Sequence, residues 1–305
     1  MVTADRASAC GILLVDKPEG MSSAHVVAVV KRSLGGLKVG HLGTLDPFAS
    51  GLLPLCVGEG TKLAPYINEA DKRYRGVIRL GVATDTLDRT GQTVAEAPVP
   101  DYSDIDLDRI AGGLLGEIAQ VPPMFSAIKK GGVPMYRLAR EGIAQELDAR
   151  GVTIHELRLT RIDPHRLGID VHCSKGTYVR SLARDIGTAL GTVGSLESLV
   201  RTAFGDFPLE RAVAMETVKT EGISALRPPA WVVGAEALGH LATTLAADAA
   251  AVSALRAGQQ RVLATFPPPA EPTAGVVARV LDTDRRLVAV LRAESGRWRI
   301  DRVFI

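Results

Sequence analysis

Gly40-His41-Leu42-Gly43-Thr44-Leu45-Asp46-Pro47-Phe48-Ala49-Ser50-Gly51 is the most informative stretch of this 305-residue sequence. Its glycines allow a ligand to approach the backbone closely, and Pro47 fixes the chain immediately after Asp46. Asp before Pro is also a common turn signal, so the stretch alone leaves open both a catalytic carboxylate and an ordinary turn residue. We predict a loop over residues 35–51 that presents Asp46.

The sequence on either side of this loop predicts both strands and helices. Residues 11–15 form a short apolar run, and Ser22 or Ser23 then caps a helix that ends before Gly35. In residues 72–82, mainly apolar side chains alternate with mainly basic ones, which indicates a half-buried strand. Similar signals predict, in chain order, a helix opened by Ser103 and Asp106, a short helix over 135–141, strands over 152–162 and 167–173, a helix from Thr177, an Ala-rich helix over 235–251, and tail strands over 275–281, 286–292 and 297–304.

These elements do not follow a strict βαβ rhythm. The better prediction is therefore an α+β fold with a large, mainly antiparallel mixed sheet flanked by helices. A small C-terminal β-rich domain follows it. We place the boundary near residue 240, which gives domains over residues 1–240 and 241–305.

The composition narrows the class of protein. Hydrophobic residues make up 46% of the chain, which excludes global disorder, and the net charge is only +2. From residue 252 onward there are nine arginines, no lysine and five acids, which fits either an RNA-contacting module or an ordinary solvated surface. Cys10, Cys56 and Cys173 form no CxxC pair, so we expect no structural zinc site and a reducing compartment. The sequence has neither a signal peptide nor an apolar run of membrane-spanning length, so we expect a soluble cytoplasmic protein.

Three further motifs accompany the Asp46 loop: residues 11–23 (GILLVDKPEGMSS), 72–74 (KRY) and 173–180 (CSKGTYVR). Together, the four motifs resemble those of the TruB family of tRNA pseudouridine-55 synthases, in the same order over about residues 10–210. The resemblance implies a pseudouridine synthase fold with a PUA-like C-terminal domain. It also implies isomerisation of uridine 55 in the T-arm of tRNA after base flipping, with no cofactor and no metal. The expected partner is tRNA alone, bound by a monomer without a guide RNA, a protein partner or a membrane.

The resemblance also implies roles for individual residues, each of which has an ordinary structural alternative such as a turn, core or surface position. By this resemblance, Asp46 is the essential carboxylate, Arg180 is its ion-pair partner, and Tyr74 stacks on the base and takes part in proton transfer. Tyr178 and Leu199 form the pocket wall. His41 fills the space left by the flipped base, and Asp88 lies near the active-site arginines. A carboxylate in a closed pocket tends to pick up a proton, so it needs a cation beside it. Asp46 could add to the base, attack C1′ or take a proton from the sugar, and the sequence leaves these routes open.

Basic residues are the candidates for gripping the RNA, because phosphate contacts dominate nucleic-acid affinity. These candidates are Lys17, Lys62, Lys72, Arg73, Lys129, Lys130, Arg137 and Arg140. The last four belong to a run over residues 124–150 that resembles the family's thumb element, which closes on the T-loop. The glycines of this run would permit movement on binding.

Two other functions stay open at this stage, and a third, a nucleotide-binding P-loop protein, carries little weight. A guide-RNA-dependent relative would share the Asp motif, although the thumb-like run and the lack of long basic extensions favour a stand-alone enzyme. An RNA chaperone with vestigial catalysis is disfavoured by the presence of Asp46, Tyr74 and Arg180. Residues 58–62 (GEGTK) have the wrong order for a P-loop.

Overall fold

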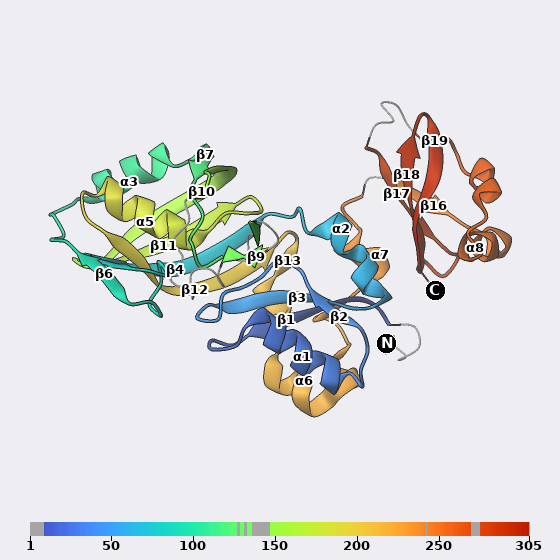
Figure 1. Ribbon diagram of the computed structural model, residues 1–305. Helices are drawn as coiled ribbons and strands as arrows, with labels where there is room; N and C mark the ends of the chain where they lie inside the picture. Colours follow the sequence, from blue (N-terminus) through green and yellow to red (C-terminus); the bar gives the residue numbers. More distant parts are fainter. Residues whose placement is uncertain are drawn as a thin grey trace.

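The computed structural model of the chain describes residues 9–126, 129–130, 133–135, 147–241, 243–269 and 275–304, without the side chains of residues 129, 130, 133 and 134 (Figure 1). Two sheets dominate these residues. A large one belongs to the body of the molecule, and a small one lies in the C-terminal part (Figure 1).

The large sheet has eleven strands among the described residues, eight of them on one path in the order β14-β1-β3-β12-β4-β11-β10-β7. The bounds on this path are β14 Val213–Ala214, β1 Cys10–Lys17, β3 Ser50–Gly58, β12 Gly194–Phe204, β4 Lys72–Leu80, β11 Arg166–Cys173, β10 Arg150–Asp163 and β7 Gly116–Gln120. Off the path, β2 (Val39–His41) pairs with β3, β13 (Phe207–Pro208) with β12 and β15 (Trp231–Val233) with β1. Within the described pairings of this large sheet only β1–β14 and β3–β12 are parallel, so the large sheet is mainly antiparallel.

Helices cover the sheet at two places. Near one end lie α3 (Asp104–Gly113) and α5 (Val179–Ala189), and near the other lie α1 (Ser23–Ser33) and α6 (Met215–Glu221) (Figure 1). Local capping explains where these helices begin. The Ser22 side chain accepts a hydrogen bond from the backbone of His25 and caps α1, and Ser103 and Asp106 form a reciprocal capping box on α3.

Shorter elements connect the main ones. They are η1 Glu59–Leu63, α2 Ala64–Ile67, the hairpin β5 Val82–Thr84 with β6 Thr93–Glu96, the two-residue strands β8 Lys129–Lys130 and β9 Val133–Pro134, η2 Leu209–Arg211, η3 Gly222–Ala225 and α7 Gly234–Ala237. Among these, α2 and α7 lie on the side of the body that faces the C-terminal sheet (Figure 1).

The C-terminal sheet has the order β16-β17-β18-β19, with bounds Thr243–Ala246, Val277–Leu281, Leu287–Glu294 and Arg297–Val303. Together with α8 (Ala249–Arg256) and η4 (Gln260–Thr265), it encloses a core of its own that includes Leu255, Val288 and Trp298. A second apolar cluster joins it to the body, and two polar contacts support that junction. Lys62 Nζ donates to the Val303 carbonyl at 2.9 Å, and the Tyr66 hydroxyl donates to Asp301 Oδ2 at 2.7 Å.

The predicted α+β fold class is therefore confirmed, but three local predictions were wrong. Residues 235–251 are not one helix, because the β-branched pair Thr243-Thr244 lies in β16 and pairs in parallel with β17. The loop predicted over 35–51 contains β2 and the start of β3, since residues 39–41 pair with residues 55–57. The helix expected from Thr177 begins at Val179, with Tyr178 at the N-cap. The predicted helix over 135–141 lies, apart from Met135, outside the described residues.

No helix among the described residues combines the length and apolarity that a membrane crossing requires.

Candidate active site

Asp46 lies on a loop between β2 and β3 whose backbone is held on both sides of the carboxylate. Ser23 Oγ accepts a hydrogen bond from the Leu45 amide and donates one to the Leu45 carbonyl, both at 2.9 Å. Ser23 is only 2% exposed, so water does not compete for these bonds. After the carboxylate, the Pro47 carbonyl accepts from the Gly20 amide at 2.8 Å and from Lys17 Nζ at 3.3 Å. The motif of residues 11–23 thus fixes the neighbours of Asp46.

Arg201, on β12, holds the beginning and the end of the same loop. Its Nε donates to the Leu52 carbonyl at 2.7 Å, and its Nη2 donates to the Gly43 carbonyl at 3.2 Å. The guanidinium lies 5.6 Å from the centre of the Phe204 ring and is almost completely buried. Gly43 has φ +66°, and a Cβ there would approach the Phe204 ring at 3.3 Å, so a glycine suits this position.

Arg180, from the first turn of α5, contacts the Asp46 carboxylate with two nitrogens. Nε lies 2.8 Å from Oδ2 as an ion pair without hydrogen-bond alignment, and Nη2 donates to Oδ1 at 3.2 Å. The Arg180 side chain is 5% exposed and that of Asp46 is 32% exposed. The cation is therefore enclosed by protein, whereas part of the carboxylate stays open to an incoming group.

The remaining contacts of Arg180 fix its position and introduce a second carboxylate. Nη1 donates to the Thr86 carbonyl and Nη2 to the Phe125 carbonyl, both at 2.9 Å. Asp88 Oδ2 lies 3.6 Å from Nη1, and Asp88 Oδ1 accepts from the amide and hydroxyl of Thr90 at 2.9 and 2.6 Å. Arg180 thus lies between two carboxylates, one buried and one open.

Burial and the neighbouring charges together raise the pKa of the Asp46 carboxyl. Burial raises the pKa of the Asp46 carboxyl above its ordinary value, the Arg180 charge opposes that shift, and the Asp88 charge adds to it. Nearby, burial lowers the pKa of Lys17 to about 8. Because Arg180 and Lys17 are the cations that favour the ionised carboxylate, the protonation state of Asp46 depends on them.

Two aromatic side chains, Tyr74 and Tyr178, are the next candidates. Tyr74 is buried on β4, opposite Arg201 on β12, and burial raises the pKa of its phenol. Burial also raises the pKa of Tyr178, whose backbone amide donates to Gln120 Oε1 at 2.8 Å. The Asp46 charge acts on the pKa of both phenols, which places both within its electrostatic range.

The remaining candidates, His41 and Leu199, come from β2 and β12. His41 is on β2, and burial followed by the charge of Arg201 lowers the pKa of its imidazole. Its Nδ1 is buried without a hydrogen-bond partner in the described part of the chain. Leu199 is buried on β12 opposite Gly76, one strand away from Tyr74 in the sheet.

Several residues expected to contact RNA have other surroundings. Lys17 and Lys72 are buried and donate to backbone carbonyls, so as surface phosphate contacts these two predictions were wrong. Lys62 is bound to the Val303 carbonyl and to Glu59. Arg73 is partly exposed and donates to both carboxylate oxygens of Glu156, at 2.7 and 2.8 Å. The side chains of Lys129 and Lys130, and all of Arg137 and Arg140, lie outside the described residues.

Sequence reasoning missed Ser23 and Arg201 as residues that hold the site. The Ser22-Ser23 doublet carried a signal, because only one of two adjacent serines can cap a helix. Arg201 carried another, since it follows Leu199 by two residues on a strand and therefore shares the inward face of that leucine. Both signals depend on knowing that these elements are buried, which the sequence did not reveal.

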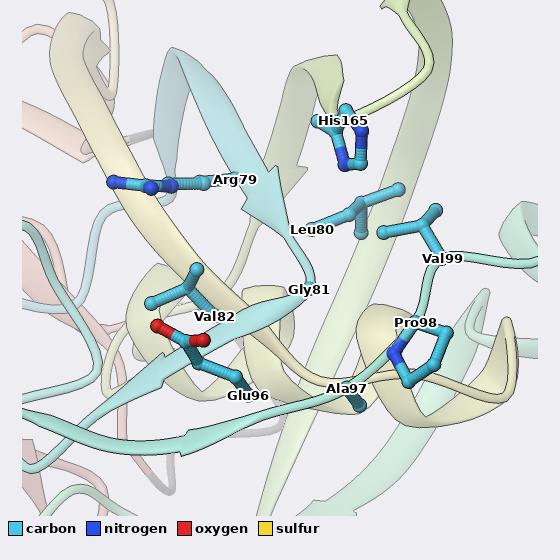
Figure 2. Close-up of a pocket in the computed structure, with 9 residues that line it drawn as sticks. All are labelled: Arg79, Leu80, Gly81, Val82, Glu96, Ala97, Pro98, Val99 and His165. Atoms are coloured by element: carbon cyan, nitrogen blue, oxygen red, sulfur yellow. The ribbon is translucent and has the colours of Figure 1, made fainter.

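A separate hollow lies away from the candidate catalytic residues. It has a volume of about 730 Å³ and is lined by Arg79, Leu80, Gly81, Val82, Glu96, Ala97, Pro98, Val99 and His165 (Figure 2). Neither Asp46, Tyr74 nor Arg180 belongs to its lining. The candidate catalytic contact is instead the one between the partly open Asp46 carboxylate and Arg180.

Comparisons with known proteins place this chain among the pseudouridylate synthases. Residues 31–179 match the family described as "TruB family pseudouridylate synthase (N terminal domain)", and residues 180–226 match "tRNA pseudouridylate synthase B C-terminal domain". The chain belongs to the TruB family.

Two curated relatives illustrate the extent of the similarity. The tRNA pseudouridine synthase B of Cupriavidus metallidurans is 42% identical over 299 residues, covering 96% of this chain and 93% of the relative. The protein of the same name from an Azoarcus species is 48% identical over 209 residues, covering 68% and 69%. The resemblance found in the four motifs is thereby confirmed over nearly the whole chain.

Solved structures support the fold. A Cbf5-Nop10-Gar1 complex contains a chain with a TM-score of 0.71 and 23% identity, covering 97% of this chain and 85% of that one. An H/ACA RNP bound to a substrate RNA containing 2′-deoxyuridine gives a TM-score of 0.70 at 22% identity, covering 97% and 85%. At these identities the likeness concerns the fold alone.

Proposed function

We propose that this protein converts uridine 55 in the T-arm of tRNA to pseudouridine, acting as a cytoplasmic monomer without a guide RNA or a protein partner. The observation that carries the proposal is the partly open Asp46 carboxylate in contact with the enclosed Arg180 guanidinium. The names of the relatives supply the substrate class, and the position in tRNA comes from the motif resemblance.

The reaction breaks the bond between uracil N1 and C1′ of the ribose, turns the base, and forms a bond between C5 and C1′. The proton leaves C5, a proton is gained at N1, and no group is gained or lost overall. Asp46 has three routes open to it: addition to the base, attack on C1′, or removal of a sugar proton. Each route begins with an ionised carboxylate, and Arg180 favours that form.

The surrounding side chains suit a base that has left its helix. Extrusion costs a few kcal/mol, and stacking on an aromatic ring returns about 1–3 kcal/mol per base. We assign that stacking and a proton-transfer role to Tyr74, and the pocket wall to Tyr178 and Leu199. His41 would occupy the space that the base vacates, and Asp88 would hold Arg180 in place through their 3.6 Å contact.

We assign the grip on the rest of the RNA to two regions. The thumb-like run over residues 124–150, with Lys129, Lys130, Arg137 and Arg140, would close on the T-loop. The catalytic domain over residues 1–240 would then be assisted by a PUA-like domain over 241–305. Its arginines would tune affinity rather than chemistry.

The test uses purified full-length protein, unmodified tRNA and EDTA, with pseudouridine mapped by position and binding measured in parallel. Wild type should convert a single T-arm position, and Asp46→Ala should lose conversion while keeping its affinity for tRNA. Asp101→Ala, an exposed aspartate before α3, is the control and should behave as wild type. Tight binding without conversion by the wild type would refute the stand-alone enzyme and favour a chaperone or a guided complex.

A further inference from the structure

A cluster of metal-ligand side chains lies away from the Asp46–Arg180 contact. Asp71, His155 and His172 each offer one ligand atom, and these atoms all lie within 4.8 Å of one another. His155 Nε2 is 3.1 Å from Asp71 Oδ2, and His172 Nε2 is 3.9 Å from the same oxygen. We propose that these three residues bind a divalent transition-metal ion of the zinc class, with at least one coordination position open.

The strand geometry explains how the three ligands meet. Asp71 immediately precedes β4, and His172 lies on β11 opposite Arg73 of β4. On β10 the register shifts between Ile154, opposite Cys173, and Glu156, opposite His172, so that His155 is an extra residue. Such a bulge re-aims side chains. Here Ile154 is buried, whereas His155 and Glu156 are both exposed.

The distances suit a metal after small side-chain rotations. Zinc bonds of about 2.0–2.1 Å in tetrahedral geometry separate the ligand atoms by about 3.4 Å. The shorter measured separation of 3.1 Å is already below that value, and the 3.9 Å separation is slightly above it. Two imidazoles and one carboxylate are a ligand set that zinc and its neighbours accept, and the site uses none of the cysteines.

Glu156 supplies the outer partner that a metal-binding histidine usually has. Its Oε1 lies 3.5 Å from His172 Nδ1, so it can accept the Nδ1 proton and leave Nε2 free for the metal. Arg73 Nη2, which can only donate, lies 3.1 Å from the same Nδ1, so metal binding at Nε2 requires Arg73 to give up this contact while it keeps its bonds to the two Glu156 oxygens. Because this cation adds a repulsive charge, we expect micromolar rather than nanomolar affinity.

The test is metal binding by tag-free, full-length protein that has been stripped with chelator. Zn²⁺ is titrated in competition with a chromophoric chelator, and Co²⁺ is titrated by visible absorbance. One equivalent should bind, and X-ray absorption should detect two imidazole ligands. Replacing a carboxylate in the outer sphere typically costs about 10–100-fold in affinity, which we expect for Glu156→Gln. His155→Gln and His172→Gln should each lose about 100-fold or more, because they remove a direct ligand.

His25→Gln is the matched control, because His25 is exposed on α1 and belongs to none of these contacts. It should bind metal as the wild type does. Absence of binding at micromolar metal, or binding that neither His155→Gln nor His172→Gln weakens, would overturn the proposal. All the substituted side chains are at least partly exposed, so each variant should fold, which circular dichroism would check.

Discussion

Replacing Ser23 by alanine tests whether the backbone clamp on Leu45 positions the Asp46 carboxylate. The substitution removes one hydroxyl and leaves a buried amide and a buried carbonyl of Leu45 without partners. Each such group costs about 1–3 kcal/mol, so the free energy of unfolding should fall by about 2–6 kcal/mol. A domain stable by about 5–15 kcal/mol tolerates the lower part of that range.

The effect on the reaction should exceed the effect on folding. A shift of about 1 Å in a catalytic group can reduce the rate about 100-fold, and the freed loop carries Asp46 directly after Leu45. We therefore expect single-turnover pseudouridine formation to fall about 100-fold under conditions where the variant is fully folded. Affinity for tRNA should change little, because Ser23 is enclosed by protein.

Ser22→Ala is the control for stability alone. Ser22 caps α1 through the His25 amide, so its loss should cost about 1 kcal/mol without loosening the loop. Denaturant titration and single-turnover assays on both variants separate the two effects. A wild-type rate in folded Ser23→Ala, or an equal loss of rate in Ser22→Ala, would refute the positioning argument.

Three further predictions concern other parts of the structure. Asp88→Asn removes a charge that raises the pKa of Asp46, so the acid limb of the single-turnover rate should move to lower pH; an unchanged limb would contradict this. Tyr66→Phe removes the hydroxyl bond to the charged carboxylate on β19, so calorimetry should show the junction with the C-terminal sheet weakened by about 1.5–3 kcal/mol. Gly51→Ala places a Cβ 2.5 Å from a backbone oxygen at φ +98° and should destabilise by at least about 3 kcal/mol in denaturant titration. Gly113→Ala, where a Cβ meets open space, should be neutral or stabilising, and equal effects of the two glycine variants would refute the steric reasoning.

Local signals in the sequence identified many of the elements correctly. The alternation in residues 72–82 predicted β4, and Ser103 with Asp106 predicted the capping box of α3. The central strand β12 was not predicted, because polar residues interrupt its alternation of apolar and polar side chains. These polar residues are buried only by the neighbouring strands. β3 escaped for a different reason: Pro54 interrupts its apolar run, and proline argues against a central strand.

The motifs predicted candidate site residues such as Asp46 and Arg180, but they did not predict the residues that hold the site in place. The motifs brought forward Asp46 and Arg180, and the structure places them in contact. A sequence cannot reveal which lysine and arginine side chains are buried and bind backbone atoms of the protein itself. Lys17 and Lys72 look like surface charges in the sequence, yet their ammonium groups bind backbone carbonyls, because burial depends on strands far away in the chain.

The insertion of β12 between β3 and β4 has a consequence for how the chain folds as it is synthesised. Asp46 and Arg180 are 134 residues apart, and β3 and β4 have no common neighbour until residues 194–204 have left the ribosome. β1 lacks one of its partner strands for even longer, because that partner, β15, comprises residues 231–233. Such long-range pairing is slow and leaves strand edges unpaired in the nascent chain. Pauses in translation before residues 194–204 have left the ribosome should therefore favour aggregation, whereas pauses after residues 231–233 have left it should be harmless to the body of the protein.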